Sequence, residues 1–236
     1  MFIKILIYIK IKMDIGNEIE IDCGDNLEID KETETKLFEK GKLATCKIIT
    51  DNWNGSGFYC IIQFKNEKIK MLFTNNHVLN NESIKVGNVI RCSYKENLKK
   101  IEITKERFCH TNAELDYTCI QIFNDDKIED FYEIEIENND NYLNEDICIM
   151  QYPNGGPLTL KGGHLKKIDK EKIQHSVTTS KGSSGSPIIL LIRDYRIIGI
   201  HRGSNNRLNL GTSMKYIIED INKKILPLME GIWELR

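Results

Sequence analysis

The feature that most constrains the fold of this chain is a series of short runs rich in β-branched and aromatic residues, separated by Gly, Asn and Asp. The first series lies between Leu37 and Asn124 and reads LATCKII, GFYCIIQF, IKMLFT, NVIRCSY, IEITK and YTCIQIF. A second series, DICIMQY, PLTLKGG, IILLI and RIIGIH, follows the polar stretch NNDNYLN. Short runs of this composition are typical of β-strands, and they predict two successive sets of about six strands.

The C-terminal segment has a different pattern. In SMKYIIEDINKKILPLMEGIWELR the apolar residues recur three and four positions apart, as on one face of an α-helix. Thr212 or Ser213 is suited to cap its start, and Pro227 is expected to end or kink it. Two sets of strands and one helix favour an all-β fold of two antiparallel six-stranded β-barrels with a C-terminal α-helix, rather than βαβ units.

This pattern divides the chain into three parts. Residues 1–36 are predicted to be an N-terminal extension, which is acidic and weakly patterned from residue 14 and holds at most one further strand. Residues 37–130 are predicted to form the first β-barrel. Residues 131–236 are predicted to form the second β-barrel together with the C-terminal helix.

Charge and cysteine content exclude several classes of function. The chain has 33 Lys and Arg against 35 Asp and Glu, without a basic stripe, so we expect no nucleic acid and no membrane surface as partner. Three lysines interrupt the apolar segment MFIKILIYIKIKM, which is therefore too short for a secretory signal or a membrane span and better suits an edge strand; Met13 is an alternative start. The 7 cysteines show neither a C-x-x-C pair nor zinc-ligand spacing. Buried reduced thiols and a cytoplasmic location are expected.

The segment KGSSGSPI, residues 181–188, holds three serines in a glycine-rich turn before an apolar run. A serine hydroxyl becomes a nucleophile only when a base is held against it. His77 in MLFTNNHVL and Asp116 in ELDYTCIQI each lie at the end of an apolar strand, so they are candidates to act with Ser184. A plain turn and a structural histidine are the alternatives, and other acids stand near Asp116 in the sequence: Asp125, Asp126 and Asp140. The G-x-S-x-G elbow of α/β-hydrolases does not fit, because position 186 is Ser and Pro187 follows it.

The runs GSGFYC, LFTNNHVL, LDYTCIQI, QYPNGG, GSSGSPI and IIGIHRG resemble, in order and at compatible spacing, trypsin-like serine peptidases of the chymotrypsin fold. The resemblance extends over roughly residues 40–230. It is closest to the glutamyl-endopeptidase branch and to the intracellular trypsin-like peptidases. It implies two β-barrels of the chymotrypsin type with an active site between them.

The resemblance also implies a role for each candidate residue. Ser184 matches the nucleophile, His77 the general base and Asp116 the group that orients the imidazole. The backbone N–H groups of Gly182 and Ser184 match the oxyanion hole, where glycine avoids crowding the tetrahedral intermediate. Ser183 replaces the aspartate that pairs with a freed N-terminus in secreted relatives, so activation by that route is not expected.

In the same resemblance, Thr179 and His201 match the base of the substrate pocket of glutamyl endopeptidases. A hydroxyl and an imidazole there predict cleavage after Glu or Asp. Arg202 adds positive charge if its side chain points the same way. A structural role for His201 in the core is the alternative. The other histidines, His110, His164 and His175, have no partner pattern and are expected to be structural or solvated, and the glycines of GSGF to allow close backbone approach.

The sequence therefore predicts a serine endopeptidase that hydrolyses peptide bonds of a protein or peptide substrate through an acyl-enzyme, without a metal or cofactor. The alternative is a catalytically silent protease-like module that binds extended peptides in the same cleft.

Overall fold

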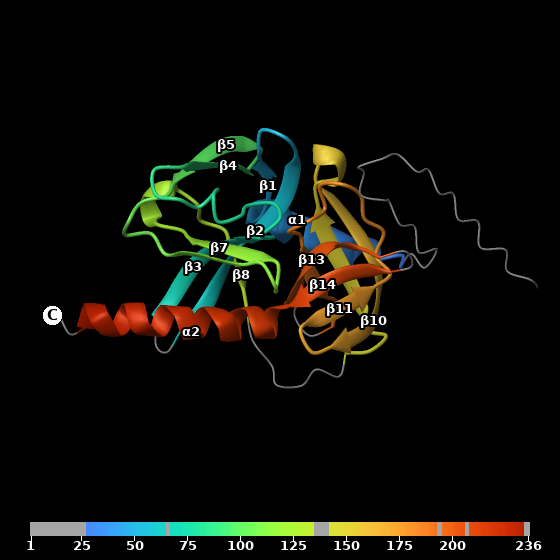
Figure 1. The fold of residues 1–236 in the computed structure, drawn as a ribbon. Helices are drawn as coiled ribbons and strands as arrows, with labels where there is room; N and C mark the ends of the chain where they lie inside the picture. The colour runs from blue at the N-terminus through green and yellow to red at the C-terminus, as the bar shows by residue number, and fades with distance from the viewer. Residues whose placement is uncertain (1–26, 65–66, 135–141, 193–194, 206–207, 234–236) are drawn as a thin grey trace, which may run out of the picture.

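The computed structural model describes residues 27–64, 67–134, 142–192, 195–205 and 208–233. Two β-units lie side by side, one helix precedes them and a second helix extends from the barrel past the first sheet (Figure 1). The predicted strand over residues 1–13 lies outside the described residues, as does most of the polar stretch between the two series of strands.

The first unit is an eight-stranded sheet with the hydrogen-bonded order β5-β4-β1-β2-β3-β7-β6, and β8 pairs parallel to β2. Its strands are β1 (Thr45–Ile49), β2 (Asn54–Phe64), β3 (Glu67–Thr74), β4 (Val89–Tyr94), β5 (Asn97–Glu102), β6 (Cys109–Asn112), β7 (Tyr117–Gln121) and β8 (Tyr132–Glu133). A short 3-10 turn, η1 (Asn124–Asp126), follows β7. Within the described residues β5 and β6 stay edge strands, so this sheet curls into a half-barrel without closing.

The second unit is a closed six-stranded antiparallel barrel in the order β10-β11-β14-β13-β12-β9. Its strands are β9 (Asp146–Gln151), β10 (Thr159–Asp169), β11 (Lys172–His175), β12 (Pro187–Leu190), β13 (Arg196–Ser204) and β14 (Asn209–Ser213), with the 3-10 turn η2 (Pro153–Gly155) after β9. The predicted all-β class of two barrel units with a C-terminal helix is confirmed, but the first unit has eight strands, one of them paired in parallel, where six antiparallel strands were predicted. The division into an extension and two domains stays a prediction.

Sequence analysis missed the helix α1 (Lys31–Ala44), where it placed the extension and the start of a strand. Asp30 caps this helix by accepting hydrogen bonds from the backbone of Glu32 and Thr33. Its apolar positions are few, so periodicity alone does not reveal it. Packing decides the structure instead: Leu37 and Ala44 are buried in a core shared with the two β-units.

The largest hydrophobic core spans the boundary between the two units. The rings of Phe58 and Phe73 from the first sheet stack with centroids 5.7 Å apart. Met150 and Ile200 of the barrel and Ile217 of the C-terminal helix belong to the same core. Smaller cores lie within each unit. The two units are therefore packed as one body and not joined only by a linker.

The C-terminal helix α2 (Met214–Trp233) follows β14 directly and continues through Pro227, so this proline does not end the helix. Among the described residues, no helix has the length and apolar character to cross a membrane. The cysteines within the described residues are not in disulfide bonds, and five of them are buried. Burial raises the pKa of the Cys60 and Cys119 thiols well above the ordinary value. Cys23 lies outside the described residues.

Asp220 fastens α2 to the first sheet. Its Oδ2 accepts hydrogen bonds from the Tyr117 hydroxyl (2.7 Å), Asn112 Nδ2 (3.0 Å) and His110 Nε2 (3.0 Å). Burial opposes ionisation of this carboxyl, but the three hydrogen bonds together hold the pKa of Asp220 below its ordinary value of 3.8. His110, expected to be structural or solvated, has a structural role as one of these donors.

Replacing Asp220 by Asn is predicted to lower the free energy of unfolding by about 1–3 kcal/mol at pH 7, because hydrogen bonds to a charged acceptor are lost. A group with a lowered pKa stabilises the fold above its ordinary pKa and loses that contribution as the pH falls through the folded value. The difference between wild type and Asp220→Asn should therefore shrink below about pH 4. Urea unfolding of both proteins at pH 7 and pH 3 measures this difference. An equal difference at the two pH values would contradict the lowered pKa of Asp220.

Candidate active site

His77 and Asp116 meet because β3 and β7 are antiparallel neighbours. Thr74 at the end of β3 pairs with Thr118 near the start of β7, so the residues just after β3 lie beside those just before β7. The Nδ1 atom of His77 is 2.8 Å from Asp116 Oδ2, and the backbone N–H of His77 donates to Asp116 Oδ1 at 3.1 Å. The carboxylate thus fixes both the imidazole and the backbone of the same histidine.

Asp116 has a left-handed backbone, with φ of 51°, which is uncommon outside glycine. The side-chain amide of the fully buried Asn75 supports it by donating to the Asp116 carbonyl at 2.8 Å. The alternative acids do not take this place. Asp126 forms an ion pair with Arg107 at 2.7 Å, Asp125 is exposed, and Asp140 lies outside the described residues.

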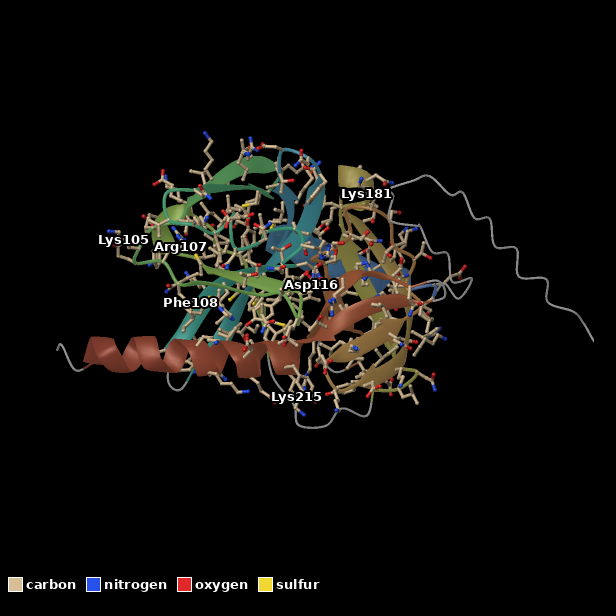
Figure 2. All side chains as sticks on the ribbon, viewed as in Figure 1. Lys105, Arg107, Phe108, Asp116, Lys181 and Lys215 are labelled. Carbon is tan, nitrogen blue, oxygen red and sulfur yellow. The ribbon has the colours of Figure 1, made fainter. Side chains whose placement is uncertain are left out.

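Arg202 is the residue whose direction sequence analysis left open. Its Nε donates to Asp116 Oδ2 at 3.2 Å, and its backbone carbonyl accepts from the Ser184 hydroxyl at 3.3 Å. One residue of β13 therefore contacts both Asp116 and Ser184. Figure 2 shows Asp116 at the junction between the first sheet and the barrel. The guanidinium therefore places a positive charge beside the Asp116 carboxylate.

Ser184 lies in a compact loop between β11 and β12. The loop turns at Gly182 and Gly185, which both have φ of 89°. The backbone N–H of Ser56 donates to the Ser184 carbonyl at 2.8 Å, so β2 of the first unit holds the loop of the second. A Cβ built on Gly55 would lie 2.6 Å from Val78, next to His77, and 3.4 Å from the Ser184 carbonyl. The glycines of GSGF thus permit the close backbone approach that the sequence predicts.

Thr179 and His201 are both buried, but their contacts differ. Thr179 donates to Asn209 Oδ1 at 2.8 Å, and Asn209 in turn donates to the Val177 carbonyl at 2.7 Å. The Nδ1 of His201 is 3.2 Å from the Nε2 of His175. His175 was expected to be structural or solvated; it is buried on β11, and the closure of the barrel brings it to His201 on β13.

This pair of imidazoles is neutral over the ordinary pH range. Burial, with a smaller contribution from His77, lowers the pKa of His201 to about 3, and burial with the neighbouring His201 lowers the pKa of His175 well below its ordinary value. The buried Nδ1 of His175 has no hydrogen-bond partner within the described part of the chain. Because an orphaned N–H is costlier than an orphaned acceptor, we assign the shared proton to His175 Nε2. His201 then carries its own proton on Nε2.

The residues matched to known proteins run from β2 into β13, and they include His77, Asp116 and the whole loop that carries Ser184. Residues 55–200 match the sequence family described as the trypsin-like peptidase domain. This chain belongs to the trypsin-like peptidase family. No curated protein matches the sequence significantly. Membership of this family supports a protease that acts on protein or peptide substrates.

Solved structures agree with the family at the level of the fold. A serine endoprotease from Yersinia pestis is similar with a TM-score of 0.62 and 13% identity, over 83% of this chain and 67% of that one. Deg5 is similar with a TM-score of 0.61 and 18% identity, over 82% and 94%. The serine protease of a human pathogenic astrovirus has a TM-score of 0.53 and 18% identity, over 73% and 90%. Across the described ranges, no group of three or more His, Cys, Asp or Glu side chains is arranged to hold a metal ion.

Replacing Gly185 by Ala tests how closely the Ser184 loop approaches the first sheet. A Cβ there would overlap the Ser56 carbonyl and the Thr74 hydroxyl, in addition to the cost of the positive φ. Gly87→Ala is the matched control, because Gly87 also has positive φ but a Cβ meets nothing within 4 Å. We expect the free energy of unfolding to fall by about 1–2 kcal/mol in the control and by about 1–3 kcal/mol more in Gly185→Ala. Urea unfolding measures both values. Equal losses would show that the loop does not contact the sheet this tightly.

Proposed function

We propose that this protein is a serine endopeptidase in which His77, Asp116 and Ser184 form the catalytic triad. The observation that carries the proposal is the contact of His77 Nδ1 with Asp116 Oδ2 at 2.8 Å, at the point where Arg202 links that carboxylate to the Ser184 hydroxyl. His77 keeps 41% of its side chain exposed, so the imidazole remains accessible to a substrate. The family and the fold support a protease at this place.

In the proposed mechanism, the Ser184 oxygen attacks the carbonyl carbon of the scissile peptide bond while His77 takes the serine proton. Asp116, with Arg202 beside it, fixes the imidazole tautomer and stabilises its charged form. The N–H groups of Gly182 and Ser184 stabilise the negative oxygen of the tetrahedral intermediate. The C–N bond then breaks as His77 protonates the leaving amine, and water, activated by the same histidine, releases the acyl group from Ser184.

Loss of the nucleophile is predicted to abolish covalent labelling by a fluorophosphonate probe. Ser184→Ala should be unlabelled, and His77→Ala should lower the rate of peptide hydrolysis by about 10⁴-fold or more. Ser186→Ala is the matched control, since it removes a buried hydroxyl of the same loop that has no partner among the described residues. A folded wild type that takes no label but binds extended peptides would favour the catalytically silent alternative.

We also propose that Thr179 and His201, with His175 packed behind them, form the base of a substrate pocket that selects Glu or Asp before the scissile bond. The neutral His201 would donate its Nε2–H to a substrate carboxylate in competition with its hydrogen bond to the Leu210 backbone, and the carboxylate charge would raise the pKa of His201 in the complex. A neutral N–H donor suits an anionic side chain; Thr179, whose hydroxyl donates to Asn209 Oδ1, would have to redirect that proton to join it. Position 178 is threonine and not an acidic residue, so it offers no negative charge to bind a basic substrate side chain.

His201→Gln is predicted to lower kcat/KM for a Glu substrate about 10- to 100-fold, as expected when a hydrogen bond to a charged group is lost. The matched substrate with Gln in place of Glu should change far less, so the ratio of the two kcat/KM values is the measurement. An unchanged ratio, or hydrolysis after other residues, would contradict the pocket assignment and leave the triad unaffected.

A further inference from the structure

Ser56 of β2 is fully buried and makes hydrogen bonds with three of its atoms. Its backbone N–H donates to the Ser184 carbonyl at 2.8 Å, and its carbonyl accepts from the Thr74 hydroxyl at 2.7 Å. Its own hydroxyl donates to the Gly182 carbonyl at 2.8 Å and accepts from the Tyr152 backbone N–H at 3.0 Å. One side chain of the first unit therefore joins two loops of the second.

Those two loops meet at the peptide that would stabilise the oxyanion. The Lys181 carbonyl accepts from the Asn154 N–H at 2.5 Å, and the next carbonyl, that of Gly182, is held by Ser56. Figure 2 places Lys181 beside the turn that contains η2. No cis peptide bond occurs in the described chain, so the Gly182 N–H points opposite to the Lys181 carbonyl. Fixing that carbonyl on the turn directs the Gly182 N–H away from the turn.

Gly182 needs this support because its backbone is free to rotate. With φ of 89° and no side chain, it has access to conformations in which the flanking peptides reverse. A Cβ at this position would lie 2.8 Å from the Tyr152 carbonyl and 3.1 Å from the Gly155 N–H, so glycine is required for the turn to pack here. Because the position must be glycine, its backbone lacks the conformational restriction that a side chain would impose.

We propose that Ser56 is a positioning residue for the oxyanion hole: its hydroxyl holds the Gly182 carbonyl and the Tyr152 N–H, and so keeps the Gly182 N–H directed at the reacting carbonyl. This inference rests on the proposed peptidase function. The inference extends that function, because the hydroxyl of a residue in the first unit sets the geometry of a loop in the second.

The test compares Ser56→Ala with Ser186→Ala in the full chain. Both variants remove one buried hydroxyl near the nucleophile, but the Ser186 hydroxyl has no hydrogen-bond partner among the described residues. Removing a whole oxyanion donor costs on the order of 100- to 1,000-fold in kcat, so misplacing one should cost about 10- to 100-fold. We expect that loss in kcat for Ser56→Ala with KM within about twofold, and little change for Ser186→Ala. A peptide aldehyde, whose hemiacetal oxygen occupies the same hole, should bind Ser56→Ala more weakly by a similar factor.

Amide hydrogen exchange gives a readout that does not need activity. Peptides covering residues 151–155 and 180–186 should exchange faster in Ser56→Ala than in Ser186→Ala, with the remaining peptides unchanged. If Ser56→Ala does not fold, Ser56→Cys replaces it, since a thiol is a weaker hydrogen-bonding group and should give the same pattern at smaller size.

Unchanged exchange of these peptides overturns the inference whether or not the wild type is active. Faster exchange with unchanged kcat overturns it too, as does a rise in KM alone or an equal loss in Ser186→Ala. A folded wild type that neither hydrolyses peptides nor takes the probe refutes the proposed function, while faster exchange in that case still supports the hold of Ser56 on the loop.

Discussion

The apolar seam between the two β-units is the interaction on which the rest of the structure depends. Phe58, Phe73, Met150 and Ile200 meet there, and α2 covers the seam with Ile217. Burying each such side chain contributes about 1.5–3 kcal/mol, whereas a typical hydrogen bond contributes about 1 kcal/mol net. The seam therefore supplies the energy that keeps His77 and Asp116 of one unit beside Ser184 of the other, and the polar contacts supply their orientation.

Polar groups around the candidate site lie in two different surroundings. Asp116 lies between His77 and Arg202 and is hydrogen-bonded to both. The imidazoles of His175 and His201 are instead buried against each other, and burial keeps them neutral. The candidate site therefore combines a hydrogen-bonded carboxylate beside His77 with a neutral imidazole pair at the proposed substrate pocket.

The two helices stabilise the β-units by packing against them. α1 places Leu37 and Ala44 in the shared core, and a Cβ on its Gly41 would lie 3.0 Å from the Tyr132 hydroxyl. Through Asp220, α2 contacts His110, Asn112 and Tyr117, the last of which directly follows Asp116. Both ends of the described chain thus stabilise the arrangement of strands that carries the site.

Much of this protein was readable from its sequence, because strands, turns and local motifs depend on neighbouring residues. The strand-rich runs, the C-terminal helix, and the contexts of His77, Asp116 and Ser184 follow from patterns within a few positions. Only the tertiary structure decided the contacts between distant segments: α1, whose weak apolar pattern is stabilised by packing; the direction of Arg202; the His175–His201 pair; and the hydroxyl of Ser56. These depend on the closure of the barrel and the apposition of two units, which no local pattern encodes, since a side chain's partners are set by which strands become neighbours in space.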